Sequence, residues 1–195
     1  MKKLNKLSVL ALTSLFILSS CETTELDLTS NPNALSPENA SVDLFINNVQ
    51  EDFANFVNSM GDVGARLTRI AQMSGDRMYQ DAYSPSSFSG VWSSAYQGMM
   101  EDIRVMNIIA AENGLTYHIG MGQVMQAYIL MTLVDYFGDV PYTEALLGAE
   151  NLNPAADSGQ SVYNSALGLL DSAISNFSGG GPAPQYDMYY GGNAD

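Results

Sequence analysis

Apolar residues recur at helical spacing along most of the chain, and this pattern constrains the fold more than any other feature. Between residues 42 and 60 they follow one another at intervals of three or four, at Val42, Ile46, Val49, Phe53, Phe56 and Met60. Such spacing places them on one face of an α-helix. No segment shows the alternation of apolar and polar residues that is typical of a half-buried strand. The sequence therefore predicts an all-α fold of antiparallel helix pairs, packed as a bundle or a solenoid.

Capping residues and glycines set the expected bounds of the helices. We expect one helix to begin with Ser36 as N-cap and Pro37 in its first turn, and to end near Gly61. The other helices are expected at residues 63–73, 89–112, 117–137 and 160–177. The helix at 89–112 carries an apolar face made of Trp92, Tyr96, Met99, Ile103, Met106 and Ala110. The helix at 117–137 is apolar on nearly all sides, so it is expected at the centre of the fold.

The N-terminal residues read as a bacterial lipoprotein signal. A basic segment, "MKKLNK", precedes an apolar run, "LSVLALTSLFIL", and small residues then lead to Cys21 in "LSSC". The apolar run is shorter than the roughly 20 residues of a membrane span. We predict a signal peptide at residues 1–20, a tether lipidated at Cys21 over residues 21–34, and a helical domain over residues 35–195. The alternative is an ordinary secretory signal beside a chance cysteine.

Charge and cysteine content exclude several classes of partner and site. The formal net charge is −14, and the predicted mature chain keeps four Arg and no Lys against 21 acidic residues. This balance argues against nucleic acid as a partner, because neutralising phosphates requires clusters of basic side chains. It also argues against charge-driven binding to anionic membranes. The single cysteine leaves no internal disulfide and no cysteine-rich zinc site.

Sequence signatures of enzymes and of bound cofactors are almost absent. The single histidine, His118, is interpreted as a surface residue near a helix N-terminus. The neighbouring acids Glu101 and Asp102 point about 100° apart on a helix, so we interpret them as solvated rather than as an acid–base pair. We therefore predict a protein that is not an enzyme and holds no cofactor or metal. A glycosidase, which needs two carboxylates from distant segments, is the enzyme alternative.

The loop before residue 89 is the candidate ligand-binding segment. It offers Arg77, Tyr79, Tyr83 and Phe88 among serines and amides. Aromatic faces beside planar hydrogen-bonding groups suit sugars, and they suit peptides equally well. The alternative is a tyrosine-rich loop that packs on its own domain.

The stretch "LVDYFGDVPYTEALLG" predicts a sharp corner after the central helix. Gly138 is expected to take a left-handed conformation, as is Gly114 after the preceding helix. The residue before Pro141 is pushed toward extended backbone. Asp139 is expected to accept backbone donors that the turn leaves unpaired, and Tyr142 to pack with Phe137 across the corner.

Together these features resemble the SusD/RagB family of outer-membrane nutrient-binding lipoproteins. The resemblance rests on the lipobox cysteine, the "NPN" in the tether and the phrase "DYFGDVPYTEAL", with Thr143 in place of the commoner serine and Val134 in place of a threonine. A second family pattern is met by Pro154, Asp157, Gln160 and Tyr163. The end of the chain, "DMYYGGNAD", resembles the lead-in to a further helix, so we expect a longer reading frame.

The resemblance implies tetratricopeptide-like helix pairs on the outer leaflet of the outer membrane. It implies a lid that binds oligosaccharides or peptides and delivers them to a SusC-like TonB-dependent transporter. Ligand contacts vary between members, so none is carried over. The family phrase at Phe137, Gly138, Asp139, Pro141 and Tyr142 is taken as structural. The alternatives are a helical-repeat lipoprotein for protein assembly and a surface glycan hydrolase.

Overall fold

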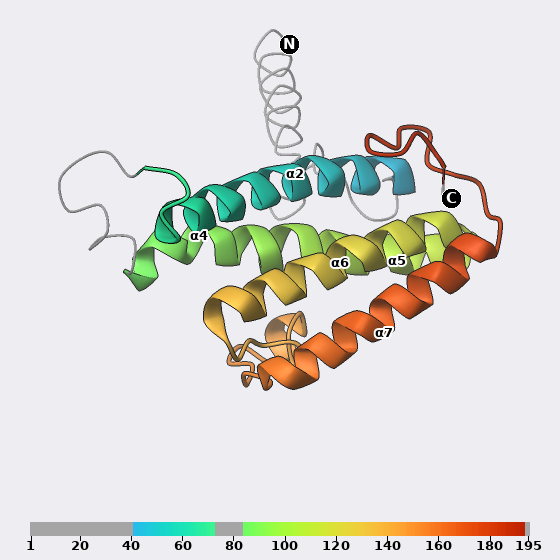
Figure 1. Cartoon of the computed structure of the whole chain (residues 1–195). Coiled ribbons are helices and arrows are strands. Elements are labelled where there is room, and N and C mark those ends of the chain that lie inside the picture. The colour runs from blue at the N-terminus through green and yellow to red at the C-terminus, as the bar shows by residue number, and fades with distance from the viewer. Residues whose placement is uncertain (1–40, 73–83, 194–195) are drawn as a thin grey trace, which may run out of the picture. The chain divides into compact units, whose positions relative to one another are not determined.

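Helices make up all the regular secondary structure in the described residues. The computed structural model describes residues 41–72 and 84–193, and these contain α2, α4, α5, α6 and α7 with the shorter helical segments η1, η2 and η3. Within these residues the sole β-type pairing is an isolated antiparallel bridge between Val140 and Asp157. The predicted all-α fold is confirmed. Successive long helices run antiparallel to each other, as the colour sequence in Figure 1 shows.

Helix α2 (Val42–Leu67) carries the predicted apolar face but has different ends. Its N-cap is Ser41, whose side chain accepts a hydrogen bond from the Leu44 N–H at 3.3 Å. The predicted cap Ser36 and its neighbour Pro37 lie outside the described residues. Ile46, Val49, Phe56 and Met60 are buried, as the spacing predicted.

The predicted break near Gly61 and the separate helix at 63–73 were wrong, because α2 continues to Leu67. The tyrosine Tyr136 of α6 donates its hydroxyl proton to the Met60 carbonyl at 2.6 Å and lies against the bare backbone of Gly64. The second glycine is therefore a packing residue that lets two helices approach, and neither glycine ends the helix. The end comes at Thr68, whose hydroxyl donates to the Gly64 carbonyl at 2.8 Å.

The predicted helix at 89–112 is one continuous rod with a π-helical segment inside it. It consists of α4 (Ser89–Trp92), the π-helix η2 (Ser93–Met100) and α5 (Glu101–Glu112), and the 3₁₀ turn η1 (Pro85–Phe88) precedes it. The i→i+5 bonds of a π-helix take more residues per turn, so the faces before and after it are rotated relative to each other. Met99, Ile103, Met106 and Ala110 are buried, whereas Trp92 and Tyr96 are half-buried. Gly114 has the expected positive φ, 67°.

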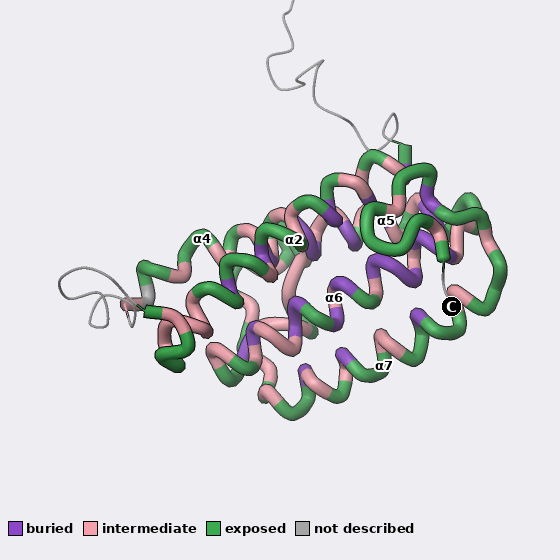
Figure 2. The backbone as a smooth tube through the Cα atoms, turned by 45° about the horizontal axis from the view of Figure 1, so that its top comes forward, coloured by how far each residue is buried: buried purple, intermediate pink, exposed green. Residues whose placement is uncertain are grey.

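Helix α6 (Thr116–Phe137) is central, as its apolar sequence predicted. It packs against α2, α5 and α7, and buried residues follow its length in Figure 2. No helix in the described ranges, α6 included, is long and apolar enough to cross a bilayer. His118, expected at the surface, is only 3% exposed, and its Nε2 lies 3.0 Å from Asp43 Oδ1. The expectation failed because α2 covers the first turn of α6 and supplies a carboxylate there.

Helix α7 (Gly159–Ser178) covers the remaining side of α6. Ser158 caps it and accepts from the Ser161 N–H at 3.3 Å. The two helices approach closely near Gly120, where an added Cβ would stand 2.8 Å from the Phe177 ring. Before α7, residues 138–158 with the short turn η3 (Gly148–Glu150) fold back beside the rod, and this return creates the site described next.

Candidate ligand-binding site

Gly138 and Val140 begin the corner between α6 and α7. Gly138 has φ 81° and ψ −112°, a positive φ as predicted but with a ψ outside the left-handed helical region. Its N–H donates to the Val134 carbonyl at 2.8 Å and closes the helix. Val140 is extended and pairs with Asp157 through two backbone hydrogen bonds of 3.1 and 3.0 Å. The corner is thus fixed to the start of α7.

Two aspartates tie the corner together through backbone donors. Asp139 accepts from the Gly159 N–H at 2.9 Å, at the first residue of α7. The Asp157 carboxylate accepts from the N–H groups of Tyr142 and Thr143 and from the Thr143 hydroxyl, each at 2.8 Å. These bonds, led by that from the Thr143 N–H, hold the pKa of Asp157 below its usual range. The Tyr163 hydroxyl also donates to Asp135, which joins α7 to α6.

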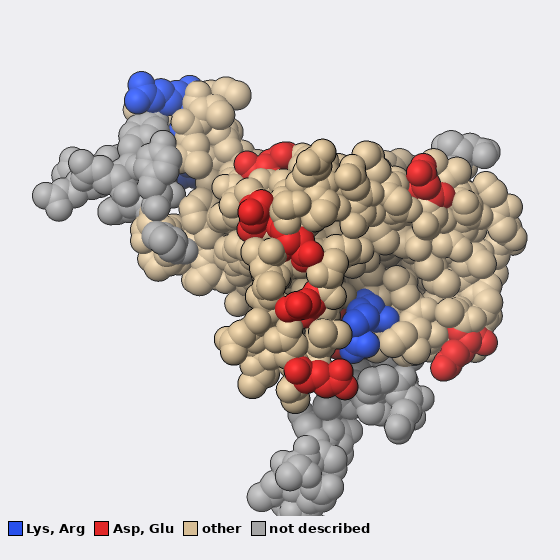
Figure 3. All heavy atoms as spheres, turned by 90° about the horizontal axis from the view of Figure 1, so that it is seen from below, with Lys and Arg blue, Asp and Glu red and all other residues tan. Residues whose placement is uncertain are grey.

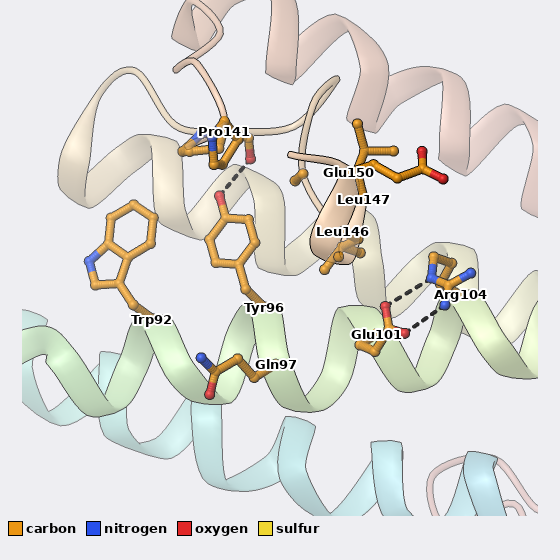
Figure 4. Close-up of a pocket in the computed structure, with 12 residues that line it drawn as sticks. Trp92, Tyr96, Gln97, Glu101, Arg104, Pro141, Leu146, Leu147 and Glu150 are labelled. Carbon is orange, nitrogen blue, oxygen red and sulfur yellow. Dashed lines mark hydrogen bonds and ion pairs between the residues drawn. The ribbon is translucent and has the colours of Figure 1, made fainter. Parts of the chain in front are cut away.

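Tyr96 links the corner to the rod. Its hydroxyl donates to the Pro141 carbonyl at 2.6 Å, as Figure 4 shows. Burial, with a smaller contribution from the charge of Asp157, raises the pKa of Tyr96 well above that of a free phenol. The hydroxyl therefore stays protonated at physiological pH, and the bond that positions the Pro141 turn over η2 is retained.

Glu144 holds the loop that follows the corner. Its Oε2 accepts from the Asn151 side-chain amide at 3.0 Å and from the Ala155 N–H at 3.1 Å. Inside this loop Leu146 has φ 61°, which costs a residue with a side chain about 1–3 kcal/mol. Such strain persists where surrounding contacts fix the backbone. Here the two hydrogen bonds to Glu144 hold the loop that contains Leu146.

A cavity of about 770 Å³ lies between the rod and this returning loop. Figure 4 shows Trp92 and Tyr96 projecting from successive turns of the rod toward Pro141, with Leu146, Leu147 and Glu150 on the opposite wall. The Trp92 and Tyr96 rings are stacked, with centroids 5.5 Å apart and planes inclined by 6°. Trp92 is backed by Phe137 at 4.9 Å, and Phe137 by Phe88 at 5.2 Å. The result is a supported aromatic wall.

The other end of the cavity is polar. Arg104 donates from Nε and Nη2 to the two oxygens of Glu101, at 2.8 and 2.6 Å. This hydrogen bond lowers the pKa of Glu101 and raises that of Arg104. Gln97 lies between this pair and the aromatic wall (Figure 4). Aromatic faces followed by planar hydrogen-bonding groups along one trough can hold an extended ligand that has apolar faces and hydroxyl edges.

A second cavity, of about 570 Å³, lies among α2, α6, α7 and residues 187–193. Its walls are mostly aromatic and aliphatic, and its one carboxylate, Asp187, already accepts from the N–H groups of Tyr189, Tyr190 and Gly192. It therefore offers a ligand fewer charged groups than the first cavity, which is lined by Glu101, Arg104 and Glu150. In the residues the structure describes, no group of three His, Cys, Asp or Glu side chains could hold a metal ion.

Comparison with known proteins identifies the family. Residues 32–195 match the SusD-like family, which is described as "Starch-binding associating with outer membrane". The chain belongs to the SusD-like family. A solved SusD/RagB family protein from Bacteroides thetaiotaomicron has the same fold, with a TM-score of 0.62 and 21% sequence identity. That match covers 76% of this chain and 32% of the solved chain. No curated protein matched.

Only some of the site residues predicted from the sequence of this SusD-like chain lie within the described residues. Arg77, Tyr79 and Tyr83 lie outside the described residues, as does Cys21. Phe88 does not line the cavity but packs behind it on Phe137. The family phrase forms the corner: Asp139 accepts a backbone donor as expected, whereas the ring contacts of Phe137 are with Phe88, Trp92 and Tyr136.

Sequence reasoning missed the cavity of the SusD-like chain and the residues that line it. Trp92 and Tyr96 were assigned to a buried helix face, and Glu101 to a solvated one. An available signal was the pair of large aromatic residues one turn apart, directly after a loop already selected for ligand binding. The second wall, residues 141–154, could not be placed beside them from the sequence, since its position depends on the Tyr96–Pro141 and Asp157–Thr143 bonds.

Proposed function

We propose that this SusD-like protein binds a glycan in the cavity between the rod and residues 141–154. The observation that carries the proposal is the stacked pair Trp92 and Tyr96, backed by Phe137 and followed along the same trough by Gln97, Glu101 and Arg104. Sugar rings present C–H faces that pack on aromatic rings, and their hydroxyls need donors and acceptors nearby. The family description as starch-binding supports an α-linked glucan as the first ligand to test.

Calorimetric titration of the full chain with maltohexaose tests this proposal. Trp92→Ala removes one half-buried ring of the wall. We expect about a two- to twelvefold loss of affinity, since aromatic contacts contribute roughly 0.5–1.5 kcal/mol. Phe88→Leu is the matched control, because it disturbs the same aromatic cluster behind the cavity without lining it. Equal losses in the two variants would show that Trp92 acts through folding and would contradict the proposal.

We propose binding without catalysis. Glu101 is paired with Arg104, so its low pKa keeps it ionised and unsuited to the role of general acid. Incubation of the full chain with maltohexaose should therefore release no new reducing ends beyond those of a buffer control. Saturable release that Trp92→Ala abolishes would point instead to a surface hydrolase.

We further propose that the protein is anchored by lipid at Cys21 to the outer membrane and passes its ligand to a SusC-like TonB-dependent transporter. The lipobox, the family and its description as associating with the outer membrane support this. Surface labelling of intact cells with a membrane-impermeant reagent, followed by affinity purification, tests it. We expect a labelled protein that co-purifies with a TonB-dependent barrel. Recovery in the cytoplasm without lipid would contradict it.

A further inference from the structure

Three charged side chains surround the proposed glycan site, and only one is positive. Glu101 and Arg104 line the cavity from α5, and Glu150 lines it from the loop wall. Two carboxylates against one guanidinium leave a net charge of −1 around the cavity. Among the described residues on the face shown in Figure 3, acidic side chains are likewise scattered, and they outnumber the basic ones.

The positive charge of the Arg104 guanidinium is balanced by the carboxylate of Glu101. Both bonds to Glu101 are short, at 2.8 and 2.6 Å, and they join two different nitrogens to two different oxygens. This bidentate geometry is the strong form of an arginine–carboxylate pair. A guanidinium has more N–H donors than these two bonds use, so Arg104 can still donate to a sugar hydroxyl. It does not present an uncompensated positive charge to a ligand.

We propose that Glu101 is a specificity-determining residue that makes this site accept neutral saccharides and reject acidic ones. The inference rests on the proposed glycan-binding function. A uronate bound along the trough would bring its carboxylate toward Arg104, where it would meet Glu101 already in place and Glu150 across the cavity. Selectivity of this kind comes from a repulsive group directed against the wrong ligand as much as from contacts with the right one.

Both partners keep their charges at neutral pH. The hydrogen bond between them lowers the pKa of Glu101 and raises that of Arg104, so neither is neutralised near pH 7. Their side chains are 37% and 45% exposed, which places the pair within reach of solvent and salt. The discrimination is therefore electrostatic and should weaken as ionic strength increases.

The test compares two ligands of the same linkage and length, one neutral and one acidic. Maltohexaose is titrated beside maltohexaose oxidised at its C6 positions, which has the same linkage and length but a carboxylate on each oxidised unit. The full chain should prefer the neutral ligand at low salt. Glu101→Gln keeps the size of the side chain and frees the charge of Arg104, and we expect the affinity for the oxidised ligand to increase about five- to tenfold relative to the neutral one.

Asp62→Asn supplies the matched control. Asp62 pairs with Arg66 at 2.9 Å on α2, so its substitution frees an arginine and removes the same charge, but neither residue lines the cavity. An equal change in both variants would show a general effect of net charge and would overturn the inference. So would an unchanged affinity ratio in Glu101→Gln with neutral binding intact. Failure of the full chain to bind the neutral ligand at all would instead contradict the proposed function, and the inference with it.

Discussion

Asp157 is the side chain on which the backbone of the α6–α7 corner converges. Its carboxylate receives two N–H groups and a hydroxyl from Tyr142 and Thr143, while its own backbone pairs with Val140. A carboxylate with three donors is held in its charged form, and the wall of the cavity that carries Leu146 and Glu150 begins at those donors. Protonation of the Asp157 carboxylate should therefore weaken the hydrogen bonds that hold the corner.

Asp157→Asn should destabilise the protein more at neutral pH than in acid. The native pKa of Asp157 lies below the value of about 3.9 expected in the unfolded chain. The stabilisation that follows is fully present above that unfolded value and is lost as the pH falls through the native pKa. Urea unfolding of the two proteins at neutral pH and in strong acid measures the difference. Asp171→Asn, exposed on α7, is the control, and a gap that stays constant with pH would contradict the assignment.

Two glycines of α2 should respond to alanine in opposite directions. Gly61 has open space around its Cα, so Gly61→Ala should stabilise the protein by about 0.5–1 kcal/mol through helix propensity. Gly64 lies against the Tyr136 hydroxyl, so Gly64→Ala should cost about 1–3 kcal/mol by forcing apart a packed contact. Chemical denaturation of each variant measures both changes, and stabilisation by Gly64→Ala would refute the packing of α2 on α6.

His118 shows why single residues are hard to place from a sequence. Its place at the start of a helix led to a surface assignment, yet it is buried beside Asp43, which lies 75 positions away. Asp43 also accepts from the Gln185 N–H at 3.2 Å, so one carboxylate serves two distant segments. Contacts of this kind depend on tertiary packing, whereas the positive φ of Gly138, though not its ψ, could be predicted because helix termination is local.

At the scale of elements, Asp139 joins α6 to α7. Asp139→Ala removes the acceptor for the first N–H of α7 and should cost about 1 kcal/mol. The loss should be local, so amide hydrogen exchange should speed up at Gly159 while the last turn of α7, near Ser178, is unchanged. Uniform acceleration along α7 would show that Asp139 supports the whole helix and would contradict this local role.

The positions of the helices could be predicted from the sequence where apolar residues recur at helical spacing. The expected bounds of α6 are off by one residue at its start and those of α7 by one residue at each end, because both helices have strong apolar patterns. The π-helical turn in the rod was not predicted, since no residue pattern marks it. Trp92, just before that segment, and Tyr96, inside it, are half-buried, whereas Met99 and Ile103 are buried.

At the scale of the whole molecule, we expect the lipid anchor to govern where the protein is found. Cys21→Ala in the full chain removes the acceptor of the lipid, and the protein should move from the detergent phase to the aqueous phase in a phase-partition assay, because each buried methylene contributes about 0.8 kcal/mol. Ser20→Ala keeps a small residue before the cysteine and is the matched control. Partition of the unaltered protein into the aqueous phase would contradict the prediction.

We have proposed that the cavity beside Trp92 binds a glycan, and the fluorescence of Trp92 can test this directly. Trp92 is the single tryptophan in the chain and lies in the wall of the cavity. Titration with maltohexaose, followed by intrinsic tryptophan fluorescence, reports on that wall alone. A saturable change in emission that agrees with the calorimetric affinity is the predicted result. Calorimetric binding with no change in tryptophan emission would place the ligand elsewhere and contradict the account.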